Sequence, residues 1–407
     1  MQPLSSTLPA IEITARAARR LAGGYLWVFS NEIVPREDLP QTASWCRFAR
    51  NGNTVAVGYF NRHSLIAGRA LAYGEKSDIQ QLMIARLQQA FARRRPFAMG
   101  QAVRLVYSEA DLLPGLVIDY YPPYAVIQSN TAGMDLMLPL LEEIMAEVIK
   151  EVLETKIEGL VVRGDSAVRQ LEGITAFTRV AFGNRDAMSQ AQIQESGVFY
   201  AADLVSGQKT GFFLDQRDNR LRLGAWVQDM GGGRVLDLFC CSGGWGLRAL
   251  HAGAQLVTFV DQSRDALQLV QSGLHANRVP AEKVVLQVED VFEFLGREKA
   301  IYDVVVVDPP AFVKSRKNLA KAVKAYQKLN RLAWRRLRPG GLLFTCSCSH
   351  HLAESDFLNL LAAAVEKEGG WAHIIHRGGQ AMDHPVLLSM PETAYLKCVG
   401  LRKLTDF

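Results

Sequence analysis

From about Asp186 onward, the chain alternates short apolar runs with segments of helical periodicity. Leu267, Val270 and Leu274, for example, recur on one face of a segment that lies between two such runs. This alternation is typical of a parallel sheet with helices on both faces. The predicted strands are Arg234–Phe239, Leu256–Val260, Val284–Val288, Tyr302–Val307, Leu342–Thr345, Ala372–Ile375 and Tyr395–Leu401. The predicted helices start near Gly246, Arg264, Asn318 and Glu354, and Arg338–Gly341 is expected to form a turn.

The first 185 residues follow two other patterns, which divide the chain into predicted domains at 1–73, 74–185 and 186–407. Residues 1–73 carry a basic helical run at Ile13–Leu21 and then strand-like pieces separated by turn residues, which predicts a small β-rich barrel. Residues 74–185 mix helices and strands, which predicts an α+β middle domain. The barrel strands are Tyr25–Phe29, Trp45–Phe48, Thr54–Phe60 and Leu65–Leu71. The middle-domain helices are Asp78–Arg94 and Leu136–Val152, and its strands are Ala102–Tyr107, Leu116–Asp119, Ala125–Ser129 and Gly159–Arg163.

Composition narrows the class of protein without identifying it. The chain has 407 residues, of which 49% are hydrophobic and 21% charged, as in an ordinary soluble globular protein. Its net charge of +5 permits a nucleic-acid partner without requiring one. Six cysteines in so long a chain are expected to be reduced thiols, and neither a signal peptide nor a membrane-spanning run is predicted. We therefore expect a cytoplasmic protein with no membrane partner.

Polar residues with chemical potential cluster where the predicted strands end. The first strand runs into a turn at Ser242 and Gly243, and the next three strands end at Asp261, Asp290 and Asp308. Ligands of open α/β sheets bind at the carboxyl ends of the strands, where an acid after the second strand can accept hydrogen bonds from ribose hydroxyls. An acid after the third strand can accept a hydrogen bond from an adenine amine. Each acid could instead be a helix N-cap, but three at consecutive strand ends favour a binding site.

The thiols differ in their expected surroundings. Cys46 and Cys398 are most simply core residues. Cys240 and Cys241 follow the first strand and are expected to pack there. Cys346 directly follows the fifth strand and should pack against the sheet, whereas Cys348 lies further out in the loop above it.

Several motifs resemble known families. GGYLWVFSNEI and VAVGYFNRHSLIAGRAL resemble a PUA domain, a small RNA-binding barrel. The glycine turn with its three acids resembles class I S-adenosylmethionine-dependent methyltransferases, and TCSCS matches the Thr-Cys-Ser or Ser-Cys-Ser motif of RNA cytosine carbon-5 methyltransferases. Together with QKTGFFLDQRD and DPPAF, these motifs make the whole chain similar to the RlmI-type 23S rRNA cytosine carbon-5 methyltransferases.

This resemblance implies a fold, a reaction and a set of site residues. The fold would be a C-terminal α/β Rossmann-like methyltransferase domain preceded by a β-barrel PUA domain and a small α+β middle domain. The cofactor would be S-adenosyl-L-methionine, the partner large-subunit ribosomal RNA, and no metal is implied; a homodimer is compatible with it. The catalytic residues would be Cys348, as nucleophile, and Asp308, beside the target base. The cofactor-binding residues would be Gln216, Phe239, Ser242, Gly243, Asp261, Asp290 and Asp308.

The sequence departs from the better-known cytosine methyltransferases at one place. Those enzymes carry a second cysteine after the proline of the DPP-type motif, where this chain has Pro310 and Ala311. The base that removes the carbon 5 proton is therefore not a second thiol. Two other functions stay open: methylation of an exocyclic base amine gripped by Asp308, with Cys348 as a packing residue, and a non-catalytic RNA-binding ribosome assembly factor. Gln216 could equally be a polar residue at a helix start.

Overall fold

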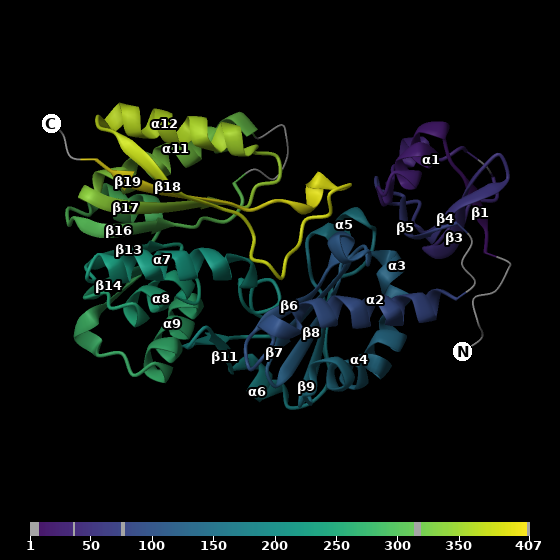
Figure 1. Cartoon of the computed structure of the whole chain (residues 1–407), viewed down its shortest axis with the longest axis horizontal. Coiled ribbons are helices and arrows are strands. Elements are labelled where there is room, and N and C mark those ends of the chain that lie inside the picture. The colour runs from purple at the N-terminus through teal and green to yellow at the C-terminus, as the bar shows by residue number, and fades with distance from the viewer. Residues whose placement is uncertain (1–7, 36, 75–77, 313–318, 405–407) are drawn as a thin grey trace. The chain divides into compact units, whose positions relative to one another are not determined.

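The computed structural model describes residues 8–35, 37–74, 78–312 and 319–404, which fold into two compact units (Figure 1). Unit 1 comprises Met1–Gln190, Asp203–Phe212 and Asp383–Thr393, and unit 2 comprises Ala191–Ala202, Phe213–Met382 and Ala394–Phe407. Two later segments of the chain therefore return to unit 1. Within the described residues, no helix is both long enough and apolar enough to span a bilayer.

The N-terminal part of unit 1 is a five-stranded sheet in the order β1-β3-β4-β5-β2, with α1 (Ala15–Ala22) packed on it. Ala17 and Leu21 of α1 join a buried apolar cluster with Phe48 and Phe60, and Thr14 caps the helix by accepting a hydrogen bond from the Ala17 amide. The four predicted strands are confirmed with shifted ends, and β1 is an addition. The strands are β1 (Ala10–Glu12), β2 (Trp27–Val28), β3 (Ser44–Arg50), β4 (Asn53–Phe60) and β5 (Gly68–Tyr73).

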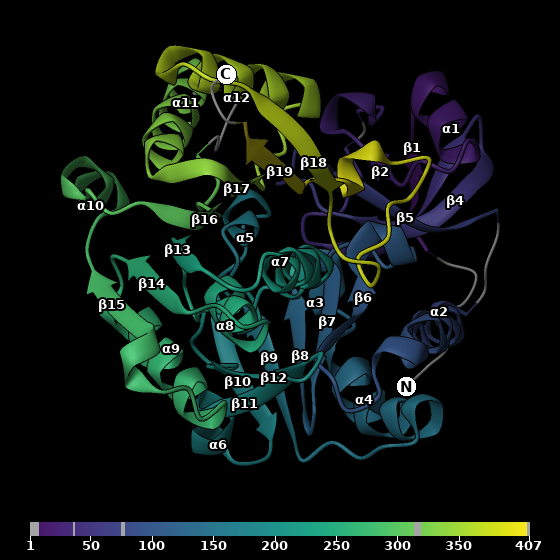
Figure 2. The same cartoon turned by 60° about the vertical axis from the view of Figure 1, so that its left-hand side comes forward.

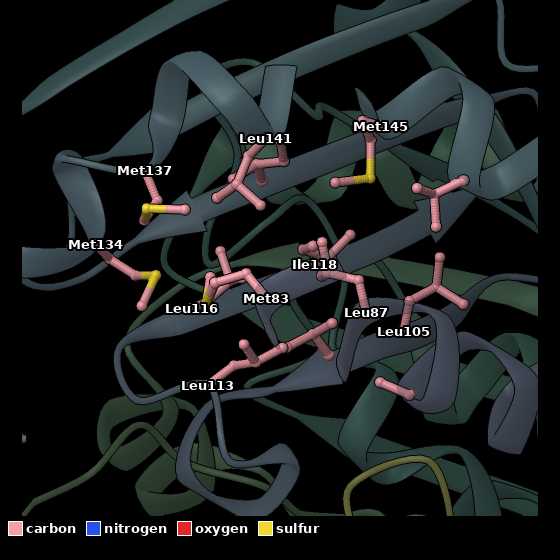
Figure 3. Packing of buried hydrophobic residues seen from close by; sticks show 14 of the residues in the cluster. Met83, Leu87, Leu105, Leu113, Leu116, Ile118, Met134, Met137, Leu141 and Met145 are labelled. Carbon is pink, nitrogen blue, oxygen red and sulfur yellow. The ribbon is translucent and has the colours of Figure 1, made fainter. Parts of the chain in front are cut away.

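The rest of unit 1 is built on a second five-stranded sheet in the order β10-β9-β8-β7-β6. The strands are β6 (Val103–Tyr107), β7 (Leu116–Tyr121), β8 (Tyr124–Ser129), β9 (Gly159–Gly164) and β10 (Phe177–Phe182). The helices are α2 (Ile79–Arg94), α3 (Ala132–Asp135), α4 (Leu138–Leu153), α5 (Val168–Leu171) and α6 (Arg185–Ser189). The core of this part is shown in Figure 3. Met83 and Leu87 from the helix α2 and Leu141 and Met145 from the helix α4 pack there with Ile118 of the strand β7.

All the predicted elements of this middle segment are present, and the sequence missed β10 and three short helices. Asp78 lies just before α2 and caps it, because its carboxylate accepts a hydrogen bond from the Gln81 amide. The helix predicted at Leu136–Val152 begins two residues later than expected, at Leu138, which Pro139 follows in the first turn.

Unit 2 contains a seven-stranded sheet in the order β15-β14-β13-β16-β17-β19-β18, which can be followed in Figure 2. The first five of these strands run parallel, and β19 lies antiparallel between β17 and β18. All seven predicted strands are confirmed, and β19 departs from the parallel direction expected for the sheet. The strands are β13 (Arg234–Leu238), β14 (Leu256–Asp261), β15 (Val284–Val288), β16 (Tyr302–Val307), β17 (Leu337–Ser347), β18 (Ala372–Gly378) and β19 (Lys397–Lys403). The hairpin of β11 (Ala191–Glu195) and β12 (Val198–Ala202) was not predicted.

Helices cover both faces of this sheet, as the alternating pattern predicted (Figure 1). One layer contains α7 (Arg217–Asp229), α8 (Gly244–His251) and α9 (Arg264–Ala276). The other layer contains α10 (Val291–Arg297), α11 (Leu319–Arg335) and α12 (Glu354–Glu368), whose apolar faces share one core with β16 and β17. The predicted start of a helix near Asn318 lies outside the described residues.

The turn predicted at Arg338–Gly341 is wrong. The strand β17 runs through it from Leu337 to Ser347, with a bulge where the register to β16 shifts. Leu337 already pairs with Tyr302, so the strand begins before Pro339. The extra residues before Leu342 form the bulge, in which Gly340 has a φ of +75°. Because the strand also continues past Thr345, Cys346 lies inside it rather than after it.

The order of the strands reverses beside β13. Its neighbours β14 and β16 lie on opposite sides, and the connections from them continue in opposite directions along the sheet. Such a switch point leaves a crevice at the carboxyl ends of the strands. The candidate site is therefore expected where β13, β14, β16 and β17 end.

Candidate active site

The loop between β13 and α8 is a tight strand-to-helix turn, as predicted. Phe239, Cys241 and Gly243 have positive φ angles of 58°, 48° and 78°, and the Gly243 amide donates to the Cys240 carbonyl at 2.7 Å. A Cβ atom added at Gly243 would lie 3.2 Å from Val270 and 3.3 Å from Phe259. The loop backbone therefore packs closely on the core beneath it.

Asp261 and Asp290 lie at the ends of β14 and β15, and both already accept hydrogen bonds. The Asp261 carboxylate accepts from the Cys241 amide at 3.0 Å and from the Ser263 amide at 2.9 Å. It thus fastens the glycine loop to the second strand. Asp290 is exposed and caps α10 through the amides of Phe292 and Glu293. The ligand roles of both acids stay predictions.

Asp308, at the end of β16, is the residue on which side chains from several elements converge. Gln216 donates through Nε2 to both carboxylate oxygens at 3.1 Å, and Trp245 donates through Nε1 at 2.9 Å. Gln216 is itself held, because its Oε1 accepts from Asn219 Nδ2 at 2.7 Å. The structure therefore joins two predicted site residues, Gln216 and Asp308, that lie far apart in the sequence.

Sequence reasoning missed Trp245, which reaches Asp308 from the first turn of α8. It also missed Asp237 in the middle of β13, the most unusual carboxyl of the site. Asp237 is fully buried, and burial, together with the neighbouring Asp308 and Asp261, raises its pKa to about 8. One carboxyl oxygen accepts from the Gly246 amide at 2.8 Å, and the other has no hydrogen-bond partner in the described structure. The sequence does contain a signal that could have identified Asp237, namely an acidic residue inside an otherwise apolar predicted strand.

The aromatic side chains link the glycine loop to the Asp-Pro-Pro turn. Phe239 and Phe312 meet edge to face with their ring centroids 6.4 Å apart, and Phe312 lies 4.7 Å from Tyr326 of α11. The Tyr326 hydroxyl lies 3.1 Å from the hydroxyl oxygens of both Ser347 and Ser349. These contacts extend from the first strand end to the loop that carries Cys348.

The cysteines of unit 2 fall into two groups. Burial raises the pKa of Cys240 and Cys346 well above the ordinary range and that of Cys241 to about 11, so these thiols resist ionisation. Cys346 is fully buried in β17, directly opposite Cys398 of β19. Cys348 instead lies just beyond the end of β17 and is half-buried. It is the one of this pair that solvent or a ligand can reach.

The sheet register relates this thiol to Asp308. Val307 of β16 pairs with Thr345 of β17, so Asp308 and Cys346 follow at the same level of neighbouring strands. Cys348 comes two residues further along, at the same edge of the sheet. An acid held by two N–H donors and an accessible thiol thus share the crevice side of unit 2.

Comparisons with known proteins agree with this geometry. A family model for S-adenosylmethionine-dependent methyltransferases matches residues 178–398, and one for PUA-like domains matches residues 11–73. The chain is 33% identical to ribosomal RNA large subunit methyltransferase I of Tolumonas auensis over 386 residues, which cover 93% of this chain and 95% of that protein. It is 36% identical to the protein of the same name from Photobacterium profundum over 380 residues, with 91% and 93% covered.

Among solved structures, a candidate SAM-dependent methyltransferase from Streptococcus mutans is similar over 97% of this chain and 100% of that one, with a TM-score of 0.79 and 22% identity. A candidate methyltransferase crystallised with SAH gives the same TM-score, identity and coverage. At this identity the likeness establishes the fold.

Proposed function

Because the chain belongs to the S-adenosylmethionine-dependent methyltransferase family, with relatives named ribosomal RNA large subunit methyltransferase I, we propose that it methylates carbon 5 of a cytosine in large-subunit (23S) ribosomal RNA through a covalent adduct with Cys348. The observation that carries the proposal is the accessible thiol of Cys348 at the end of β17, on the strand next to the one that ends at Asp308.

The residues around the glycine loop fit the cofactor. S-adenosylmethionine supplies a methyl group on a positively charged sulfonium. The unpartnered oxygen of Asp237 is a buried hydrogen-bond acceptor whose carboxylate form would gain from a nearby cation. Phe239, Ser242 and Gly243 shape the loop at the methionine end. Asp261 accepts two hydrogen bonds from backbone amides and still has lone pairs for ribose hydroxyls, because a carboxylate has about four acceptor positions.

Three more predicted residues complete the proposed site. Asp290 would accept from the adenine amine. Gln216 would lie beside the cofactor and hold Asp308 in place through its two hydrogen bonds. Asp308 would face the target base, where its carboxylate can accept a hydrogen bond from the exocyclic amine of cytosine.

The chemistry explains why a thiol is needed. Carbon 5 of cytosine is a weak nucleophile. When the Cys348 thiolate bonds to carbon 6, the electron pair of the ring double bond becomes available at carbon 5, which takes the methyl group from the sulfonium. Loss of the carbon 5 proton to a base then restores the double bond and expels the thiolate. Cys348 is regenerated at the end of the reaction, and the base passes the proton to solvent.

The RNA must present an unstacked cytosine, because a base inside a helix cannot reach the crevice. Unpaired loops are therefore the expected substrates. The PUA-like part of the chain would supply affinity and register through contacts with phosphates and RNA shape.

A trapping experiment tests the proposal. RNA transcripts of the large-subunit sequence that contain 5-fluorocytosine should form an adduct that survives denaturation, because fluorine at carbon 5 blocks the elimination step. We expect the adduct with the wild-type protein and with Cys346→Ser, and none with Cys348→Ser. Trapping by Cys348→Ser at the wild-type rate would show that another group is the nucleophile.

Nucleoside analysis of RNA treated with the protein and S-adenosylmethionine separates the alternatives. We expect 5-methylcytosine. A methylated exocyclic amine with no 5-methylcytosine would favour the amine reaction, and no detectable S-adenosylmethionine binding in calorimetry would favour the assembly factor.

A further inference from the structure

The side chain of Lys397, the first residue of β19, lies beside the loop that carries Cys348. In the antiparallel pairing of β17 and β19, Lys397 is directly opposite Ser347, the residue before Cys348. Its Nζ donates a hydrogen bond of 2.7 Å to the carbonyl of Ser349, the residue after Cys348. The half-buried ammonium group is thus hydrogen-bonded to the backbone just after this thiol, and the backbone of Lys397 pairs with the residue just before it.

We propose that Lys397 is a positioning residue that stabilises the thiolate form of Cys348 through the positive charge of its ammonium group. The inference rests on the proposed function, in which Cys348 is the nucleophile. An unperturbed thiol is only a few per cent ionised at neutral pH, and a neighbouring cation increases that fraction.

The electrostatics around Lys397 agree with this assignment. Burial lowers the pKa of the Lys397 ammonium, whereas Cys348 and Glu354 act to raise it. The interaction between the two side chains is reciprocal: a thiolate that favours the charged ammonium is favoured by it to the same extent.

Other titratable groups surround this pair. Burial, Lys397 and the neighbouring His351 lower the pKa of His350, whose ring stacks on Tyr395, so His350 is largely neutral near pH 7. Burial raises the pKa of Tyr326, so its hydroxyl stays protonated. Glu354, at the start of α12, is the opposing charge, and it acts on Lys397. Lys397 is therefore the cation that the described contacts hold at the Cys348 loop.

The test follows the ionisation of Cys348 directly, without RNA. The full-length protein is treated with iodoacetamide between pH 6 and 10, and tandem mass spectrometry measures alkylation at Cys348 against the other cysteines. The variants are Lys397→Gln, which keeps an N–H donor for the Ser349 carbonyl but has no charge, Lys397→Met, which has neither, and Lys397→Arg, which restores the charge.

We expect the midpoint of alkylation to rise by at least about one pH unit in both neutral variants, with about ten-fold slower alkylation at pH 7, and to stay near the wild-type midpoint in Lys397→Arg. If Lys397→Met alone is shifted, Lys397 only supports the loop and the proposal is wrong. A midpoint that is unchanged in all folded variants also refutes it.

The readout separates this inference from the proposed function. A raised midpoint in Lys397→Gln, combined with no adduct between the wild-type protein and 5-fluorocytosine RNA, supports the action of Lys397 on the thiol and contradicts the nucleophilic role of Cys348. An adduct combined with an unchanged midpoint supports Cys348 and contradicts the role of Lys397. Circular dichroism identifies variants that have not folded, and Lys397→Gln, the smallest change, then decides the question.

Discussion

Replacing Gly246 by alanine tests how closely α8 packs against the sheet beneath the glycine loop. A Cβ atom at this position would lie 2.2 Å from Cε1 and 2.6 Å from Cζ of Phe259. Phe259 is fully buried in β14, so its ring has no free space to enter. The Gly246 amide also donates to Asp237, which ties this residue to the centre of the site.

The magnitude follows from two opposing effects. Alanine is favoured over glycine in a helix by about 1 kcal/mol. Overpacking of a filled core costs about 1–3 kcal/mol, and an approach of 2.2 Å calls for the upper end of that range. We expect Gly246→Ala to lower the free energy of unfolding of unit 2 by about 2 kcal/mol. For a unit of roughly 200 residues, this corresponds to a fall in Tm of about 4–8 °C.

Differential scanning calorimetry of the full chain measures this change, and two variants serve as controls. Gly296 is an exposed helical glycine in α10 with no atom within 4 Å of an added Cβ. Gly296→Ala should therefore raise stability by about 0.4–1 kcal/mol. In a double-mutant cycle, Phe259→Leu should relieve part of the Gly246→Ala loss, because the two changes act on one contact.

Two results would refute the reasoning. The first is a Tm of Gly246→Ala at or above that of the wild type, which would mean that the helix moves away from β14 at little cost. The second is additivity of Gly246→Ala and Phe259→Leu, which would mean that the loss does not come from this contact.

Three further predictions concern carboxyl groups. Because the pKa of Asp237 is raised to about 8, its protonated form stabilises the fold below about pH 4 and this contribution is lost as the pH rises toward 8. Asp237→Asn should therefore flatten the dependence of Tm on pH between 4 and 8, and weaken S-adenosylmethionine binding in calorimetry. An unchanged slope of Tm against pH would contradict the raised pKa of Asp237. Asp308→Asn should lower kcat about 10- to 100-fold in a methyl-transfer assay, since the neutral amide loses the charge-assisted hydrogen bond to the base and one acceptor oxygen for Gln216 or Trp245; wild-type kcat would exclude a catalytic role for Asp308. Glu172→Ala should cost about 3 kcal/mol in urea unfolding, because the buried Arg69 loses its nearer carboxylate partner at 2.9 Å and keeps Glu109 at 3.9 Å, whereas Glu154→Ala, at an exposed pair, should cost under about 0.5 kcal/mol.

The sequence determined most of the elements of this protein. The strands of the seven-stranded sheet were visible as apolar runs, most clearly the central ones such as β13 and β16, because strands covered by helices on both faces must be apolar on both sides. The glycine turn and the acids at Asp261, Asp290 and Asp308 were visible for a local reason: chain direction alone places the residue after each parallel strand at the same edge. The position of Cys348 beyond a strand end was visible in the same way, whereas its choice as nucleophile came from the resemblance of the TCSCS motif.

Only the tertiary structure decided which of these residues act on one another. Gln216 and Trp245 meet Asp308 because separate elements cross there, and no local pattern records such a crossing. The raised pKa of Asp237 depends on complete burial beside other acids, which is a property of the packed sheet. Lys397 reaches the Cys348 loop only through the antiparallel pairing of β19 with β17. The sequence sets where polar groups stand along each strand, whereas distance, burial and local charge arise only when the strands are placed side by side.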